Sequence, residues 1–340
     1  MKLRVGVVGL GDGWEHRHRP ALWALADRFE VRAVCDQVGH RACQAAREFG
    51  AEVVEGFHAL ARREDIDAVL LLDCQWYGSL PVLAACEAAK AVYCSFGLSL
   101  DPSEAQTLKR RVDESGIAFM AEFPRRQAPA THRLKELIAT RLGPPQLLFC
   151  HRRLGDDGDG RNPAGCSRRN TLVQEIVELV DWCCYVVGHG ATWVSGLSHG
   201  REARRCDLDY QMLSLGFADA NAEPGGAVAQ VSCGRYIPAE WPEAISFRPL
   251  ASLQVSCRRG IAFVDLPATL VWFDESGRHQ EPLDSERTVG EQLLTQFHRA
   301  VTSLVRRTSD LEDAFRALTI VQRAEQSSRE GRRMILGDEP

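Results

Sequence analysis

The sequence lacks any hydrophobic run long enough to cross a membrane. A spanning helix needs about 18 or more consecutive apolar residues, and no segment approaches that length. The apolar segment Leu3–Val8 is short and runs into glycines, which is typical of a buried strand and not of a signal peptide. We therefore expect no membrane partner and no secretory leader.

Paired metal-binding cysteines are also missing. The chain has twelve cysteines but no Cys-x-x-Cys motif, and His16 and His18 have no cysteine or carboxylate partner at ligand spacing. Thiols such as Cys35, Cys94 and Cys183 lie inside apolar strand or helix patterns, as buried thiols do in a reducing compartment. The sequence predicts no metal site and a cytoplasmic location.

An excess of positive charge is absent too. The 41 Lys and Arg residues are outnumbered by 46 Asp and Glu residues, and the resulting net charge of −5 argues against a nucleic-acid partner. The apolar share of 45% and the charged share of 26% are those of an ordinary soluble globular protein. A length of 340 residues exceeds what one hydrophobic core usually organises, so we expect two domains.

Residues 1–122 alternate between strand-like and helix-like segments. Strands that are apolar on both faces and joined by helices predict a parallel, doubly wound α/β sheet of the Rossmann type. The predicted strands are Leu3–Val8, Val31–Cys35, Ala68–Leu72, Ala91–Cys94 and Ile117–Ala121. The predicted helices are Pro20–Phe29, Arg41–Phe49, Leu80–Ala89 and Ser103–Ser115.

Residues 123–340 follow a different rhythm and predict a second, α+β domain. Helices are expected at Ala130–Arg141 and Thr171–Val187, with a strand at Gln146–Arg152 between them. Consecutive strands without intervening helices then indicate an open, mainly antiparallel sheet. These strands are Thr192–Ser198, Gln211–Phe217, Ala227–Tyr236, Ser252–Arg258, Ile261–Leu266 and Thr269–Phe273. Helices Val289–Val305 and Leu311–Gln326 close the chain. An uncovered apolar sheet face predicts a homo-oligomer, most simply a dimer.

A glycine-rich turn follows the first strand and predicts a dinucleotide site. Gly9 permits the tight turn, and Gly11 lets the backbone approach a pyrophosphate at the start of a helix. The third glycine of the fingerprint is replaced by Trp14, and Gly13 substitutes for it in a slightly longer turn. A glycine pair alone is weak evidence, because any tight strand-to-helix turn can use one.

The end of the second strand strengthens this prediction. Asp36 stands 25 residues after Gly11, where a carboxylate binds the ribose hydroxyls of a dinucleotide. The alternative is a solvated strand end. Arg41 follows at a distance and no arginine directly follows Asp36, which favours NAD over NADP while leaving NADP open.

Several short segments, in order and spacing, resemble the Gfo/Idh/MocA family of sugar and polyol oxidoreductases. They are Arg19-Pro20-Ala21-Leu22, Ala33-Val34-Cys35-Asp36, Asp65-Ile66-Asp67-Ala68-Val69, Lys90-Ala91-Val92-Tyr93-Cys94 and Gly143-Pro144. The resemblance implies a Rossmann domain, a second domain whose open sheet often serves dimerisation, and an NAD(P)-dependent reaction. By position it also assigns Asp73 and Ser95 to the cofactor.

One departure from the family concerns the lysine that helps to handle the proton of the reacting hydroxyl. Family members usually carry Glu-Lys-Pro after the strand that here ends at Cys94, and this chain has Ser95-Phe96-Gly97 there. Phe96 can neither transfer a proton nor stabilise an alkoxide. The resemblance therefore leaves the proton acceptor to another residue.

The long helix carries the next candidates. Gln174, Glu178 and Asp181 stand where the family shows Asp, His and Asp, at i, i+4 and i+7 on one face of an otherwise apolar helix. We expect this stripe to face the substrate in an interdomain cleft, with Glu178 and Asp181 catalytic and Gln174 binding substrate. The alternative is a satisfied structural hydrogen-bond network.

Arg125 and Arg126 occupy a segment that borders the cleft in the family. They are candidates to bind substrate hydroxyls or a carboxylate, and the alternative is an interdomain salt link.

Two functions of the protein stay open. The first is an oxidoreductase that moves a hydride between NAD and a sugar, polyol or related hydroxy compound. The second is a catalytically inactive dinucleotide-binding sensor or regulator, which the missing lysine favours.

Overall fold

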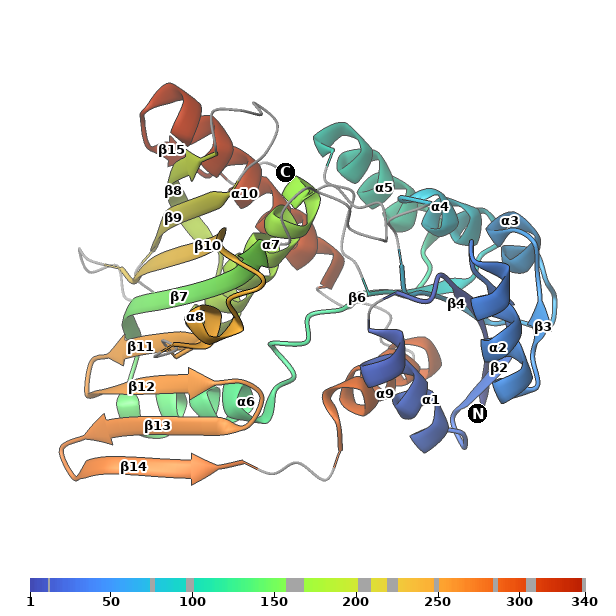
Figure 1. The fold of residues 1–340 in the computed structure, drawn as a ribbon, viewed down its shortest axis with the longest axis horizontal. Helices are drawn as coiled ribbons and strands as arrows, with labels where there is room; N and C mark the ends of the chain where they lie inside the picture. The colour runs from blue at the N-terminus through green and yellow to red at the C-terminus, as the bar shows by residue number, and fades with distance from the viewer. Residues whose placement is uncertain are drawn as a thin grey trace. The chain divides into compact units, whose positions relative to one another are not determined.

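The computed structural model describes residues 1–11, 13–73, 77–95, 101–156, 168–200, 209–218, 226–247, 251–283, 287–303 and 310–337. The chain forms two compact units (Figure 1). One comprises Met1–Pro124 with Glu286–Phe315, and the other comprises Arg125–Ser285 with Arg316–Pro340.

The first unit is built on a parallel sheet with the strand order β3-β2-β1-β4-β5-β6. The strands are β1 (Leu3–Val8), β2 (Phe29–Cys35), β3 (Glu52–Val53), β4 (Ala68–Leu71), β5 (Ala91–Cys94) and β6 (Phe119–Ala121). The order reverses between β1 and β4, where doubly wound sheets place their ligands. The predicted Rossmann-type fold is confirmed.

Helices join these strands and cover the sheet. They are η1 (Trp14–His18), α1 (Arg19–Ala24), α2 (Gly39–Phe49), α3 (Phe57–Ala61), α4 (Leu80–Glu87) and α5 (Pro102–Ser115). The predicted helix Val289–Val305 appears as α9 (Val289–Thr302), which begins with a capping box between Thr288 and Glu291. It lies beside α1 and buries Leu293, Leu294 and Phe297 in the same core as β1 (Figure 1).

The second unit is built on a larger sheet with the order β14-β13-β12-β11-β7-β10-β9-β8-β15. Only β7 and β10 pair in parallel among the described strands of this sheet, so the predicted mainly antiparallel sheet is confirmed. Its strands are β7 (Pro145–Asp156), β8 (Ala191–His199), β9 (Tyr210–Phe217), β10 (Val228–Pro238), β11 (Leu253–Cys257), β12 (Gly260–Asp265), β13 (Thr269–Asp274), β14 (Gly277–Pro282) and β15 (Met334–Ile335).

One face of this sheet is covered by helices. Helices α7 (Arg168–Val187) and α10 (Asp310–Glu330) cover it, and Gly196 of β8 lets the backbone of α10 approach so closely that a Cβ would meet the carbonyl of Ala324. The remaining helices of this unit are α6 (Pro129–Leu137), η2 (Ile138–Leu142) and α8 (Pro242–Ser246).

Side chains alternate between the two faces along each strand. Leu148, Leu213 and Val231 are buried on the covered face, whereas Leu147 and Phe149 are exposed on the other. The sheet therefore has one open, partly apolar face, as the strand pattern predicts.

Candidate functional site

The glycine turn after β1 fits closely against the end of β4. Gly9 has a φ of +73°, and a Cβ on it would lie 2.7 Å from the Cβ of Asp73. A Cβ on Gly11 would lie 2.5 Å from the carbonyl oxygen of Leu72. No larger residue fits either position without moving the backbone, so only glycine lets the turn pack this closely against the end of β4.

Asp36 is tied directly to this turn. Its Oδ2 accepts a hydrogen bond from the backbone N–H of Leu10 at 2.7 Å, and its Oδ1 accepts one from Val38 at 2.8 Å. A carboxylate oxygen can accept more than one hydrogen bond, so these contacts orient Asp36 and still allow it to accept ribose hydroxyls. The structure thus brings Asp36 beside the glycine turn.

Ser95 and Gly13 complete the predicted cofactor residues. The Ser95 Oγ donates to the carbonyl of Leu72 at 2.8 Å, and the Ser95 N–H donates to the carbonyl of Leu71 at 2.9 Å. Gly13 precedes η1, where its carbonyl accepts from two N–H groups and a Cβ would lie 2.9 Å from the ring of His18. The carboxyl ends of β1, β2, β4 and β5 thus bring the predicted cofactor residues together.

Tyr77 is a further residue at this end of the sheet. Burial raises the pKa of the Tyr77 phenol to about 12, and the neighbouring Cys35, Asp36 and Asp73 act in the same direction. Its ring packs edge-on against Phe57, with the centroids 5.3 Å apart. Tyr77 is therefore a neutral hydroxyl close to Asp36. Its position four residues after Asp73, a predicted cofactor residue, was the available sequence signal.

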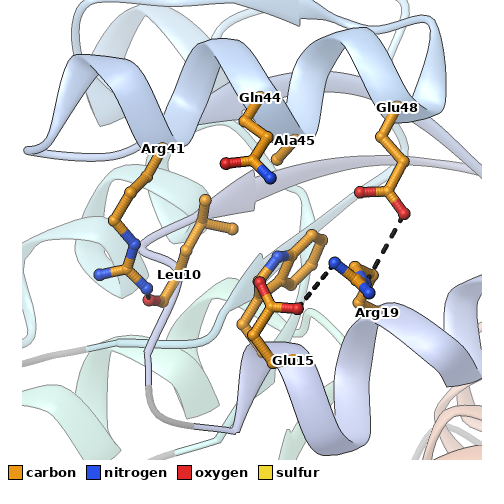
Figure 2. Close-up of a pocket in the computed structure, with 8 residues that line it drawn as sticks. Leu10, Glu15, Arg19, Arg41, Gln44, Ala45 and Glu48 are labelled. Carbon is orange, nitrogen blue, oxygen red and sulfur yellow. Dashed lines mark hydrogen bonds and ion pairs between the residues drawn. The ribbon is translucent and has the colours of Figure 1, made fainter.

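A polar hollow lies between α2 and the η1–α1 segment, next to the glycine turn (Figure 2). Arg41 donates to the carbonyl of Leu10 at one end of it. At the other end Figure 2 shows Arg19 between two carboxylates, 2.7 Å from Glu15 and 3.6 Å from Glu48. Arg41 is thus held against the turn through a backbone contact, and the described contacts include no ion pair between Arg41 and Asp36.

A buried ionic cluster that the sequence did not reveal supports η1. Glu122, just after β6, receives a hydrogen bond from Arg17 and contacts Nε2 of His18 at 2.8 Å. Burial alone would raise the pKa of Glu122, but His18 and Arg17 hold it below its usual range. The only sign of this cluster in the sequence was a charged residue, Glu122, directly after the buried strand β6.

In the second unit, Asp181 of α7 is bound to Arg126. The guanidinium donates from Nε to Oδ2 at 2.7 Å and makes a second bond to Oδ1, while its face lies 5.1 Å from the ring centre of Tyr185. Only 2% of the Asp181 side chain is exposed. Asp181 is therefore held inside the unit by a two-bond ion pair.

Arg125 binds the neighbouring turn of the same helix. It donates to Glu175 at 2.7 Å and to Glu178. Burial alone would lower the pKa of Arg125, but Glu178 and Glu175 raise it. Glu178 keeps 34% of its side chain exposed, so it is far more accessible than Asp181. Gln174 is half-buried on the same helix.

The two arginines thus pair with α7 inside the second unit. Glu175 was not among the predicted residues, because it lies one position outside the i, i+4, i+7 stripe. Phe96, which stands at the family's lysine position, lies outside the described residues.

Among the described residues, no cluster of three or more His, Cys, Asp or Glu side chains could hold a metal ion. Within the same ranges, no helix is long and apolar enough to cross a membrane.

Residues 3–123 match the family model described as the oxidoreductase family with an NAD-binding Rossmann fold, GFO_IDH_MocA. An inositol 2-dehydrogenase of Cereibacter sphaeroides is 31% identical over 192 residues, 54% of either chain. A dTDP-3,4-didehydro-2,6-dideoxy-alpha-D-glucose 3-reductase of Actinomadura kijaniata is 34% identical over 126 residues, 36% of either chain. The chain matches about half the length of the first of these relatives, and less of the second.

Solved structures resemble the fold over nearly the whole chain. A levoglucosan dehydrogenase in complex with NADH and levoglucosan has a TM-score of 0.83 at 16% identity, covering 99% of this chain and 100% of that one. An oxidoreductase from Thermotoga maritima has a TM-score of 0.80 at 17% identity, covering 98% of both. At these identities the likeness establishes the fold. The names of these relatives give no support to the alternative of an inactive regulator.

Proposed function

We propose that this chain, whose residues 3–123 belong to the Gfo/Idh/MocA oxidoreductase family and its NAD-binding Rossmann fold, is an NAD-dependent dehydrogenase of a sugar, polyol or related hydroxy compound. The observation that carries the proposal is the fit of Gly9 and Gly11 against the end of β4, with Asp36 held beside them. A turn that tolerates no Cβ next to a ribose-binding carboxylate is what a dinucleotide requires.

The residues of the first unit fit the cofactor. Gly9, Gly11 and Gly13 form the turn whose backbone binds the pyrophosphate, and Asp36 accepts the hydroxyls of the adenosine ribose. Asp73 and Ser95 border the same edge of the sheet. When bound, the nicotinamide supplies the acceptor or donor of the hydride.

Asp36 also favours NAD over NADP. A carboxylate whose oxygens are fixed by the N–H groups of Leu10 and Val38 cannot turn away from a 2′-phosphate, and it repels that group. Arg41, the nearest candidate to offset the repulsion, donates to the Leu10 carbonyl. Affinity for NADP should therefore be lower than for NAD.

Glu178 is the residue that we assign to the proton of the reacting hydroxyl. It is the more exposed of the two predicted carboxylates, and Arg125 fixes its orientation. Asp181 is bound by Arg126 and almost fully buried, so we assign it to positioning α7. Gln174 is assigned to substrate binding. In the first unit, Phe96 replaces the family's lysine, so a carboxylate base is expected to give slow turnover of ordinary sugars and polyols.

The test is a screen of inositols, hexoses and hydroxy acids with NAD, following reduced cofactor by absorbance. Turnover that Glu178→Gln abolishes and Asp27→Asn leaves intact would support the assignment, since Asp27 is an exposed carboxylate, 74% accessible, in the first unit. Turnover unchanged in Glu178→Gln would contradict the role of Glu178. Failure to bind NADH would contradict the whole proposal.

We also propose a homodimer formed through the open sheet face of the second unit. Apolar side chains are exposed along that face on several strands, namely Leu147, Phe149, Leu197, Val228 and Phe273. An apolar patch of this kind is typical of an interface.

Burial raises the pKa of the Cys233 and Cys257 thiols to about 12, so these thiols stay protonated and unreactive, which suits a reducing cytoplasm.

A further inference from the structure

Three strands of the second unit bring polar residues into one row on the face that α7 covers. Cys233 of β10 lies opposite Arg152 of β7 on one side and opposite Gln211 of β9 on the other. A register shift between Gly234 and Ile237 interrupts the strand there, but Arg235 lies close enough to Cys233 for its charge to lower the pKa of that thiol, while a Cβ on Gly234 would meet Tyr210 and Tyr236 on the other side. Tyr236 packs instead against Tyr210 on the opposite face.

Two members of this row have buried polar atoms without protein partners. Gln211 is 0% exposed, and neither its Oε1 nor its Nε2 makes a hydrogen bond. The Nε of Arg235 is buried and likewise unbonded. Buried amide and guanidinium groups are nearly always satisfied, so two unsatisfied groups on neighbouring strands point to something that binds both.

The charges around the row favour an anion. Arg125 is committed to Glu175 and Glu178, whereas Arg152 only approaches Glu175, at 4.0 Å. Over the part of the chain that is described, Arg235 makes no ion pair, and its backbone N–H bonds the carbonyl of Asp209. The pKa of the Cys233 thiol, which burial raises to about 12, responds to Glu175 and, in the opposite direction, to all three arginines. These four charges therefore all lie close enough to Cys233 to act on its thiol.

We infer that Arg152, Gln211 and Arg235 form a subsite for an oxyanion carried by the substrate, a carboxylate or a phosphate. Arg235 and the Gln211 amide donate to the anion, and Gln211 Oε1 accepts from a hydroxyl of the same substrate. A sugar acid or a sugar phosphate offers this pairing, and a neutral polyol does not. The inference rests on the proposed function and narrows its substrate class.

The experiment compares D-gluconate, D-glucose 6-phosphate and D-glucose on the full-length protein saturated with NADH. Calorimetry measures binding, and NAD-linked turnover is measured separately. Wild type should bind at least one of the two anionic probes more tightly than D-glucose, and the preferred probe identifies the anion as carboxylate or phosphate. Arg235→Ala should weaken that binding by about 10- to 100-fold, the loss expected for a charge-assisted hydrogen bond.

Arg153→Ala is the matched control. Arg153 follows Arg152 on β7 but points to the opposite face, where it donates to the carbonyl of Phe247 at 3.2 Å. The Arg153→Ala variant should bind all three probes with the same affinities as the wild-type protein. Equal losses in Arg153→Ala and Arg235→Ala would overturn the inference, because a general charge effect would then explain both.

Gln211→Met separates a binding role from a purely structural one. It removes a buried unsatisfied amide while nearly keeping its shape, so the melting temperature should rise. Anion affinity should fall by about fivefold or more as the donor is lost. A more stable variant with unchanged anion binding would overturn the role of Gln211.

The two proposals fail differently. Wild type that binds D-glucose as well as the anions, or no probe at all, would refute the subsite even if a neutral polyol is turned over. Tight, Arg235-dependent anion binding without turnover of any compound would refute the dehydrogenase and support the subsite.

Discussion

Replacing Arg126 by methionine should destabilise the second unit strongly. Arg126 donates two hydrogen bonds to Asp181, and the two side chains are 10% and 2% exposed. Removing one partner of a buried ion pair costs about 3–5 kcal/mol, because the buried carboxylate loses the opposite charge and both hydrogen bonds of the guanidinium. The free energy of unfolding should fall by roughly that amount.

Two further variants sharpen this prediction. Arg126→Met combined with Asp181→Leu should recover most of the loss, since apolar residues often replace a buried pair at little cost. Arg133→Met is the control: Arg133 pairs with Glu281 at 2.8 Å, but the two side chains are 29% and 31% exposed, and it should cost at most about 1 kcal/mol.

Urea unfolding followed by tryptophan fluorescence measures all three variants. Trp182 adjoins Asp181 on α7, is fully buried, and should report the loss of packing there. The reasoning would be refuted if Arg126→Met were as stable as Arg133→Met. Loss of NAD-linked turnover without loss of stability would then make Asp181 a ligand-contacting carboxylate and not a positioning one.

Three other outcomes are expected. Asp36→Ala should weaken NADH binding about tenfold and make the affinities for NADH and NADPH equal, as measured by cofactor fluorescence. Equal affinities in the wild-type protein would contradict the role of Asp36. Glu122 has a lowered pKa in the folded state, so its stabilisation is present above about pH 4.5 and is lost as pH falls through its folded pKa. The stability of Glu122→Gln should therefore depend less on pH on the acid side, and an unchanged acid unfolding curve would argue against the cluster with His18. Phe149→Glu should give a monomer mass in light scattering. A monomer mass for the wild-type protein at micromolar concentration would refute the proposed dimer.

Elements that bury apolar side chains could be predicted from the sequence. Strand β5 has the predicted bounds Ala91–Cys94, and α7 begins three residues before the predicted Thr171. Strand β14, Gly277–Pro282, was missed because its side chains are polar and mostly exposed, so hydrophobic alternation gives no signal. Backbone pairing with β13 forms it instead, after a turn at Glu275 and Ser276 that leads into Gly277, whose φ is +108°.

The start of the helix after the glycine turn also differs from the prediction. The structure begins it at Trp14, as η1, and not at Pro20. Hydrophobic spacing could not show this, because His18 is buried there by its contact with Glu122, 104 positions away. A polar residue that is buried by a distant partner breaks the local pattern on which the prediction relied.

The predicted cofactor residues converged because strand ends in a parallel sheet meet at one edge, a rule that needs only the order of the strands. The ion pairs of the second unit follow no such rule. Arg125 reaches Glu178 across 53 positions, and nothing local distinguishes a carboxylate that binds substrate from one that binds arginine.

Gln211 shows what sequence can still reveal about such a site. It is in phase with Leu213, Leu215 and Phe217, the buried face of β9. A polar residue at a position where alternation demands an apolar one costs stability unless it has a partner. Its neighbours Arg152 and Arg235 come from strands whose register only the folded sheet defines. The sequence can therefore mark the residue that needs a ligand, while the structure is required to identify the charge of that ligand.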